Sequence, residues 1–156
     1  DLNFVSVSFP LFWQARNKKN NRKTELKLRE AEWLASEAAV KTGDFSSYPA
    51  KDFHEAWKIA LRNQFHDIIP GSSIHEVYED STEEYRKANE ILDAIEKNAL
   101  KVLTRDAAST VTVVNNSSFA GEGIVTVKGF EDKEGSWLSA DGKELPAVRT
   151  ENGWLV

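Results

Sequence analysis

The stretch IHEVYEDSTEEYRKANEILDAIEKNALKV, residues 74–102, carries the clearest structural pattern of this chain. Its seam positions recur in alternating steps of four and three residues, and Ser81 is the one clearly polar member. These positions are Ile74, Tyr78, Ser81, Tyr85, Ala88, Leu92, Ile95, Ala99 and Val102. Such spacing is typical of a long helix that packs lengthwise against other helices. We therefore predict a long helix here, with a capping box formed by Ser73 and Glu76 at its start.

Two shorter helical patterns precede this long one. Residues 23–42 carry a buried stripe of Ala31, Leu34, Ala35 and Ala38, widened by Leu26 and Trp33, and Gly43 is a natural terminator. Residues 50–68 carry an apolar face made of Phe53, Trp57, Ala60, Leu61, Phe65 and Ile68. Pro70 and Gly71 end that helix. Three helices with short connections predict an antiparallel bundle over residues 23–104.

After about residue 105 the pattern changes to the period of two that is typical of strands. Strands are expected at residues 109–115, 123–129, 136–140, 144–149 and 152–156. We interpret residues 105–156 as the start of a truncated antiparallel β-sandwich, and residues 1–22 as a leading segment. Within that segment we expect the basic cluster 16–23 to be a solvated loop. The predicted fold class is therefore α+β.

Composition excludes several classes of function. The 156 residues carry a net charge of −5, which argues against non-specific binding of nucleic acid. There is no cysteine, so disulfides and cysteine-based zinc sites are excluded. No run of 18 apolar residues is present, and the first residues lack the basic start of a signal peptide. We expect a cytoplasmic protein that does not enter a membrane.

His66 and Asp67 are the candidate site residues. If the second helix runs to Ile68, its helical wheel turns His66 away from the apolar face, at a helix end where a cation is favoured. A neutral imidazole is a common ligand for zinc-like ions. The alternative is a solvated surface histidine. Neither His54 nor His75 has metal-ligand spacing to His66, so most of any metal site would lie outside this chain.

The run FHDIIPGSS, residues 65–73, resembles the hallmark of the middle domain of family 38 glycoside hydrolases, the α-mannosidases. The resemblance extends over residues 54–85, over QARNKKNNRKTELKLREAEWLAS at residues 14–36, and over VTVVNNSSF at residues 111–119. It implies that His66 ligates one divalent ion, usually zinc, and that Asp67 bonds to mannose hydroxyls. It also implies that both catalytic carboxylates of the retaining reaction lie on an N-terminal barrel outside this chain.

The resemblance also implies the partners. They are an α-mannoside or a mannose-containing oligosaccharide, the catalytic barrel and the rest of the β-domain, while a homo-oligomer is left open. We expect no catalytic residue in this chain and no activity from it alone. Two alternatives remain: a helical interaction module that docks through the third helix, and a non-catalytic carbohydrate-binding domain that uses Trp13, Trp137 and Trp154.

Overall fold

A computed structural model describes residues 8–104, 109–130 and 134–156, which fall into a helical unit up to residue 105 and a β unit after it. The helical unit contains α1 (Ser8–Thr42), the short 3₁₀ helix η1 (Phe45–Ser47), α2 (Ala50–Asn63) and α3 (His75–Leu103). The β unit contains β1 (Thr126–Val127), β2 (Trp137–Leu138), β3 (Glu144–Leu145), β4 (Val148–Thr150) and β5 (Gly153–Leu155). The predicted α+β class is confirmed.

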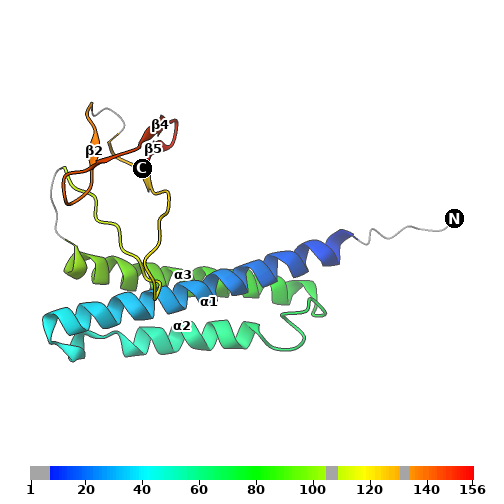
Figure 1. The fold of residues 1–156 in the computed structure, drawn as a ribbon. Helices are drawn as coiled ribbons and strands as arrows, with labels where there is room; N and C mark the ends of the chain where they lie inside the picture. The colour runs from blue at the N-terminus through cyan, green and yellow to red at the C-terminus, as the bar shows by residue number, and fades with distance from the viewer. Residues whose placement is uncertain (1–7, 105–108, 131–133) are drawn as a thin grey trace. The chain divides into compact units, whose positions relative to one another are not determined.

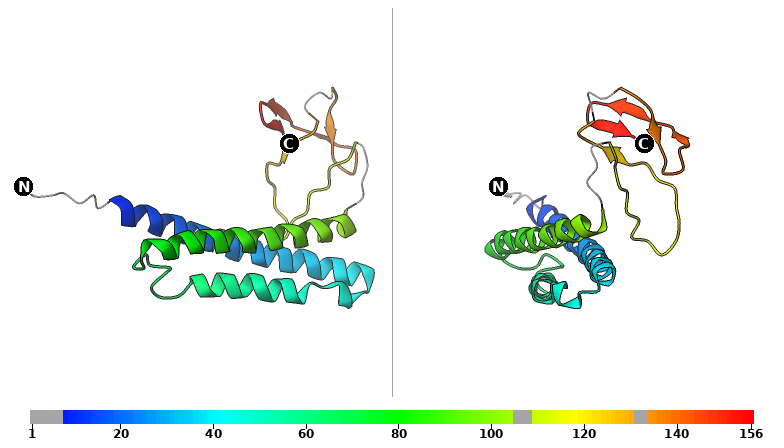
Figure 2. Two further views of the ribbon diagram at one scale, coloured as in Figure 1. Left: turned by 180° about the vertical axis from the view of Figure 1, so that it is seen from behind. Right: turned by 90° about the vertical axis from the view of Figure 1, so that its left-hand side faces the viewer.

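The three long helices form an up-down-up bundle (Figure 1). Consecutive helices run antiparallel, and α1 and α3 lie side by side, with α2 against both (Figure 2). Gly43 has a φ of 72°, so it ends α1 in the left-handed conformation that glycine adopts without strain. The predicted antiparallel bundle is therefore confirmed.

The start of α1 differs from the prediction. The helix begins at Ser8 rather than at residue 23, so the basic cluster 16–23 is helical and the expectation of a loop there is wrong. The inward face continues toward the N-terminus through polar residues in steps of three and four: Thr24 and Asn17 are buried, and Asn21 is half-buried. The predicted helix start rested on an apolar stripe, and therefore fell where the inward face becomes polar.

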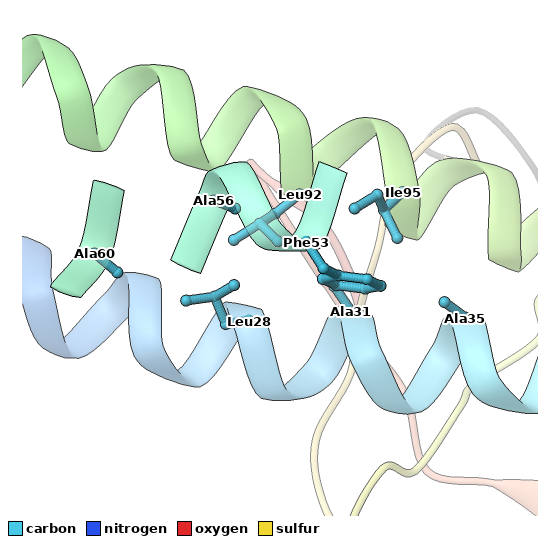
Figure 3. Close-up of a cluster of buried hydrophobic side chains, with 8 residues drawn as sticks. All are labelled: Leu28, Ala31, Ala35, Phe53, Ala56, Ala60, Leu92 and Ile95. Carbon is cyan, nitrogen blue, oxygen red and sulfur yellow. The ribbon is translucent and has the colours of Figure 1, made fainter. Parts of the chain in front are cut away.

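The apolar core lies between the three helices (Figure 3). Its eight buried residues are Leu28, Ala31, Ala35, Phe53, Ala56, Ala60, Leu92 and Ile95. The stripes predicted for α1 and α3 are confirmed at their centres, but Leu26, Trp33, Ile74 and Val102 are exposed. On α2 the buried line runs through Phe53, Ala56 and Ala60, so Leu61, expected in the core, faces solvent. Phe65, also expected in the core, lies beyond the end of α2 and is exposed.

Helix α2 ends at Asn63 instead of continuing to residue 68. The Asn63 side chain is buried, and its amide donates to the Ile59 carbonyl (3.0 Å) and to Glu84 Oε2 (2.7 Å). The amides of Gln64 and Phe65 then bond three residues back, which tightens the chain into turns. The expected capping box is also wrong: Ile74 occupies the cap position of α3 without a side-chain bond.

The β unit contains two small antiparallel sheets, with strand orders β1-β5-β4 and β2-β3. Pro146, which cannot donate a ladder hydrogen bond, separates β3 from β4 where one strand was predicted. Residues 109–115, also predicted as a strand, have no strand conformation, and Val111 and Val113 are exposed. Within the described parts of the chain, no helix is long and apolar enough to cross a membrane.

Candidate functional site

His66 and Asp67 lie in the run of turns, residues 64–71, that follows α2; we call this run the motif loop. Their side chains are 77% and 55% exposed, and His66 Nε2 is 3.5 Å from Asp67 Oδ2. That separation exceeds a normal hydrogen bond, so neither group is committed to the other. His66 does face away from the core, but because of the turn and not because of the helical wheel, which assumed a longer helix.

The carbonyl of Asp67 ties the motif loop to the start of α3. It accepts hydrogen bonds from Ser73 Oγ at 2.8 Å and, at 3.4 Å each, from Ser72 Oγ and the Tyr78 hydroxyl. The same hydroxyl accepts a bond from the Ser73 amide at 2.9 Å. The main-chain carbonyl of Asp67 is therefore held by residues at the start of α3, while its carboxylate is exposed to solvent.

Helix α1 holds the motif loop at two further points. Gln64 Nε2 donates to Asn21 Oδ1 (3.2 Å) and to Glu25 Oε1 (2.9 Å). Asn17 Nδ2 donates to the Ile68 carbonyl at 3.0 Å. His66 and Asp67 lie between these two anchors. Polar side chains of α1 therefore contact the motif loop on both sides of the exposed pair.

The sequence prediction missed these asparagines because they fall in the cluster interpreted as a loop. The signal that could have found them is their spacing, since Asn17, Asn21 and Thr24 continue the steps of four and three of the α1 stripe. Their partners lie on the matching face of α3. Ser81 Oγ bonds to Asn17 (2.9 Å), the Tyr85 hydroxyl to Asn21 (3.2 Å), and Asn89 Nδ2 to Thr24 (3.0 Å).

The metal-binding capacity of the described residues is limited. Among them, no three histidine, aspartate or glutamate side chains are grouped closely enough to hold an ion. His75 is paired with Glu79 at 3.2 Å. The motif loop therefore offers one imidazole and one carboxylate, whereas a structural or catalytic zinc site takes three or four protein ligands. A metal site that uses His66 needs donors from elsewhere.

The tryptophans proposed as an alternative carbohydrate platform lie in the β unit. Trp137 and Trp154 meet edge to face with ring centroids 6.4 Å apart, and Trp154 Nε1 donates to the Phe130 carbonyl at 2.9 Å. They line an open cavity of about 200 Å³ together with Ser109, Phe130, Glu134, Gly135 and Ser136. Both tryptophan side chains are half-buried. The Trp13 side chain lies outside the described residues.

Comparison with protein families matches residues 13–103 to the alpha mannosidase middle domain. Among curated proteins, the chain is 45% identical to an alpha-mannosidase of Saccharomyces cerevisiae over 65 residues, or 42% of the chain. It is 41% identical to alpha-mannosidase 2C1 of mouse over 71 residues (46% of the chain) and 40% identical to the human protein of that name over 67 residues (43%). The matched segments cover only 6–7% of the length of these relatives.

Proposed function

Since the chain belongs to the family of alpha mannosidase middle domains, we propose that it is part of a retaining α-mannosidase that hydrolyses terminal α-D-mannosides. In this proposal it contributes His66 and Asp67 to an active site that residues outside this chain complete. The observation that carries the proposal is the exposed pair itself. Two adjacent polar side chains are presented to solvent on a loop whose backbone accepts hydrogen bonds from Asn17 of α1 and Tyr78 of α3.

The proposed role of His66 is to ligate a divalent ion, with zinc as the expected metal. Its imidazole is 77% exposed, and its distance of 3.5 Å from Asp67 leaves the ring nitrogens available to an ion. A bound divalent ion supplies Lewis-acid polarisation of sugar hydroxyls. The other ligands would come from the rest of the protein, because the described residues place no third donor beside the pair.

The proposed role of Asp67 is to accept a hydrogen bond from a mannose hydroxyl. Its carboxylate is 55% exposed, while its carbonyl is held by Ser73. Bonds to a charged acceptor are short and strong, so a fixed carboxylate can orient the sugar ring. The mannose would thus be aligned by a residue that does not itself react.

The bond-breaking groups would lie outside this chain. A retaining glycosidase needs two carboxyl groups about 5–5.5 Å apart, one as nucleophile and one as acid and base. Asp67 is the one carboxylate that the motif loop itself carries. The proposal therefore assigns this chain to metal and substrate binding, and assigns proton transfer and nucleophilic attack to the catalytic barrel.

Two substitutions in the full-length protein separate the proposed roles. His66→Ala should reduce bound metal and lower turnover by more than about 100-fold, because even residues outside the ligand shell are worth about 10–100-fold. Asp67→Asn should leave the metal content unchanged and lower kcat/KM by about 10- to 150-fold, which corresponds to a charged hydrogen bond of about 1.5–3 kcal/mol.

Metal analysis and steady-state kinetics on an α-mannoside measure both effects. His75→Ala is the matched control, since His75 is also exposed but lies on α3 beside Glu79. It should change neither metal content nor rate. Full metal occupancy and wild-type rates in His66→Ala would leave this residue as an ordinary surface histidine, and the proposal would fail.

A further inference from the structure

We propose that Asn17 is a positioning residue for the His66–Asp67 pair: it fixes the motif loop so that both side chains point to one place. The inference rests on the proposed function and deepens it. Asn17 lies on α1, far from the motif loop in the sequence. Its contact with Ile68 exists only because the bundle folds. Its side chain is 5% exposed, so it is shielded from competing water.

Both ends of the Asn17 amide are used, and by different elements. Its Nδ2 donates to the Ile68 carbonyl on the motif loop at 3.0 Å. Its Oδ1 accepts from Ser81 Oγ on α3 at 2.9 Å. An asparagine suits this place because it presents a donor and an acceptor at once. The Ile68 carbonyl can only accept, so it defines which end of the amide faces the loop, whereas the Ser81 hydroxyl can either donate or accept.

The Ile68 carbonyl is well placed to control the pair. It directly follows Asp67, and it also accepts the Gly71 amide at 3.2 Å, which closes the turn at a glycine with a φ of 95°. On the other side of the pair, Gln64 is held one helical turn further along α1 by Asn21. Residues 65–67 thus bridge two anchors on α1, and their own side chains are exposed.

Substitution of Asn17 by Asp tests the donor specifically. The shape is retained and a carboxylate oxygen still accepts from Ser81, but no N–H remains for the Ile68 carbonyl. Two oxygens then face each other in a buried site, which is unfavourable. Asn17→Ala is a second variant that removes both bonds without adding charge. Ser81→Ala is the matched control, because it removes a buried bond of Asn17 and leaves the bond to the motif loop.

The experiment uses the full-length protein and three measurements. Amide hydrogen exchange of a peptide covering residues 64–71 reports on the loop, a Zn²⁺ titration of the metal-free protein reports on His66, and kinetics report on the assembled site.

For Asn17→Asp and Asn17→Ala we expect loop exchange to become at least about tenfold faster and Zn²⁺ affinity to fall about 10- to 100-fold, the usual effect of losing an outer-shell partner. Turnover should fall in parallel, with exchange in residues 90–103 of α3 unchanged. Ser81→Ala should leave loop exchange and Zn²⁺ affinity near wild type.

Two outcomes would overturn the inference. The first is wild-type loop exchange or wild-type Zn²⁺ affinity in both Asn17 variants. The second is an equal effect in Ser81→Ala, which would make Asn17 a general packing residue. His66→Ala, measured in parallel, separates this failure from that of the proposed function. If His66→Ala loses Zn²⁺ while the Asn17 variants do not, only the positioning role fails; if His66→Ala keeps Zn²⁺ and turnover, the proposed function fails and the positioning role with it.

Discussion

At the scale of single residues, Tyr85 is the largest fully buried side chain of the described chain. Its hydroxyl donates to Asn21 Oδ1, the atom that also accepts from Gln64. Burial raises the pKa of the Tyr85 phenol well above its ordinary value, and the nearby carboxylates of Glu25 and Glu84 act in the same direction. The folded bundle therefore requires a neutral phenol at this position.

This pKa shift predicts a loss of stability at alkaline pH. The pKa in the folded state is raised, so the unfolded chain releases the phenol proton first, above about pH 10, the ordinary pKa of tyrosine. The stabilisation is complete below that pH and is lost as the pH rises toward the folded-state pKa. Thermal unfolding between pH 8 and pH 11 should show a smaller decrease of Tm in Tyr85→Phe than in the wild type. Equal decreases would show that Tyr85 does not ionise on unfolding.

At the scale of elements, the interface of α1 and α3 has a polar half and an apolar half. The polar half pairs Asn17 with Ser81, Asn21 with Tyr85, and Thr24 with Asn89. The apolar half contains Leu28, Ala31 and Ala35 against Leu92 and Ile95. The polar half is the end that contacts the motif loop. One long seam therefore both stabilises the bundle and fixes the candidate site.

Leu92→Ala tests the apolar half. Leu92 is fully buried in the three-helix core, so the truncation should lower the free energy of unfolding by about 2–5 kcal/mol. Leu61→Ala removes the same atoms from a side chain that is 58% exposed, and should cost less than about 0.5 kcal/mol. Denaturant unfolding of both variants measures the difference. Similar costs at the two positions would contradict the orientation of α2 described above.

Gly153→Ala tests the pairing of β1 with β5. Gly153 has a φ of 121°, and a Cβ there would lie 2.3 Å from the Val127 carbonyl oxygen, so backbone must move. We expect a cost of about 1–3 kcal/mol, typical of a strained backbone position. Trp137 and Trp154 lie in the β unit, so tryptophan fluorescence during unfolding follows that unit once Trp13, Trp33 and Trp57 are replaced by Phe. Gly121→Ala, with nothing within 4 Å, is the control and should have little effect.

At the scale of the whole molecule, the described residues supply only part of the proposed active site. The described residues supply a histidine and an aspartate, with no third metal-binding side chain grouped with them. The relatives extend far beyond the segment that matches this chain. Under the proposed function, the active site would form where the motif loop meets another part of the polypeptide.

This incompleteness predicts that residues 1–156 alone do not hydrolyse an aryl α-mannoside. The reason is chemical, since a retaining reaction needs two carboxyl groups at close separation and the motif loop carries one. Release of the aryl alcohol, followed with zinc present and with the full-length protein as positive control, measures this. If the chain still hydrolyses the mannoside after contaminating enzymes are removed, the catalytic pair lies inside residues 1–156.

The three long helices, their antiparallel order and the centre of the α3 seam could be predicted from the sequence, because apolar spacing reflects which face each helix buries; the short helix η1 was not predicted. The sequence also singled out His66 and Asp67, because their motif is local. Only the tertiary structure decided where α1 begins and where α2 ends. The polar part of α1 bonds to distant residues, as Asn17 does to Ile68, and the last residue of α2, Asn63, bonds to Glu84 on α3. The residue type of an asparagine does not show whether its side chain is buried. Burial follows from its hydrogen-bond partners on other helices.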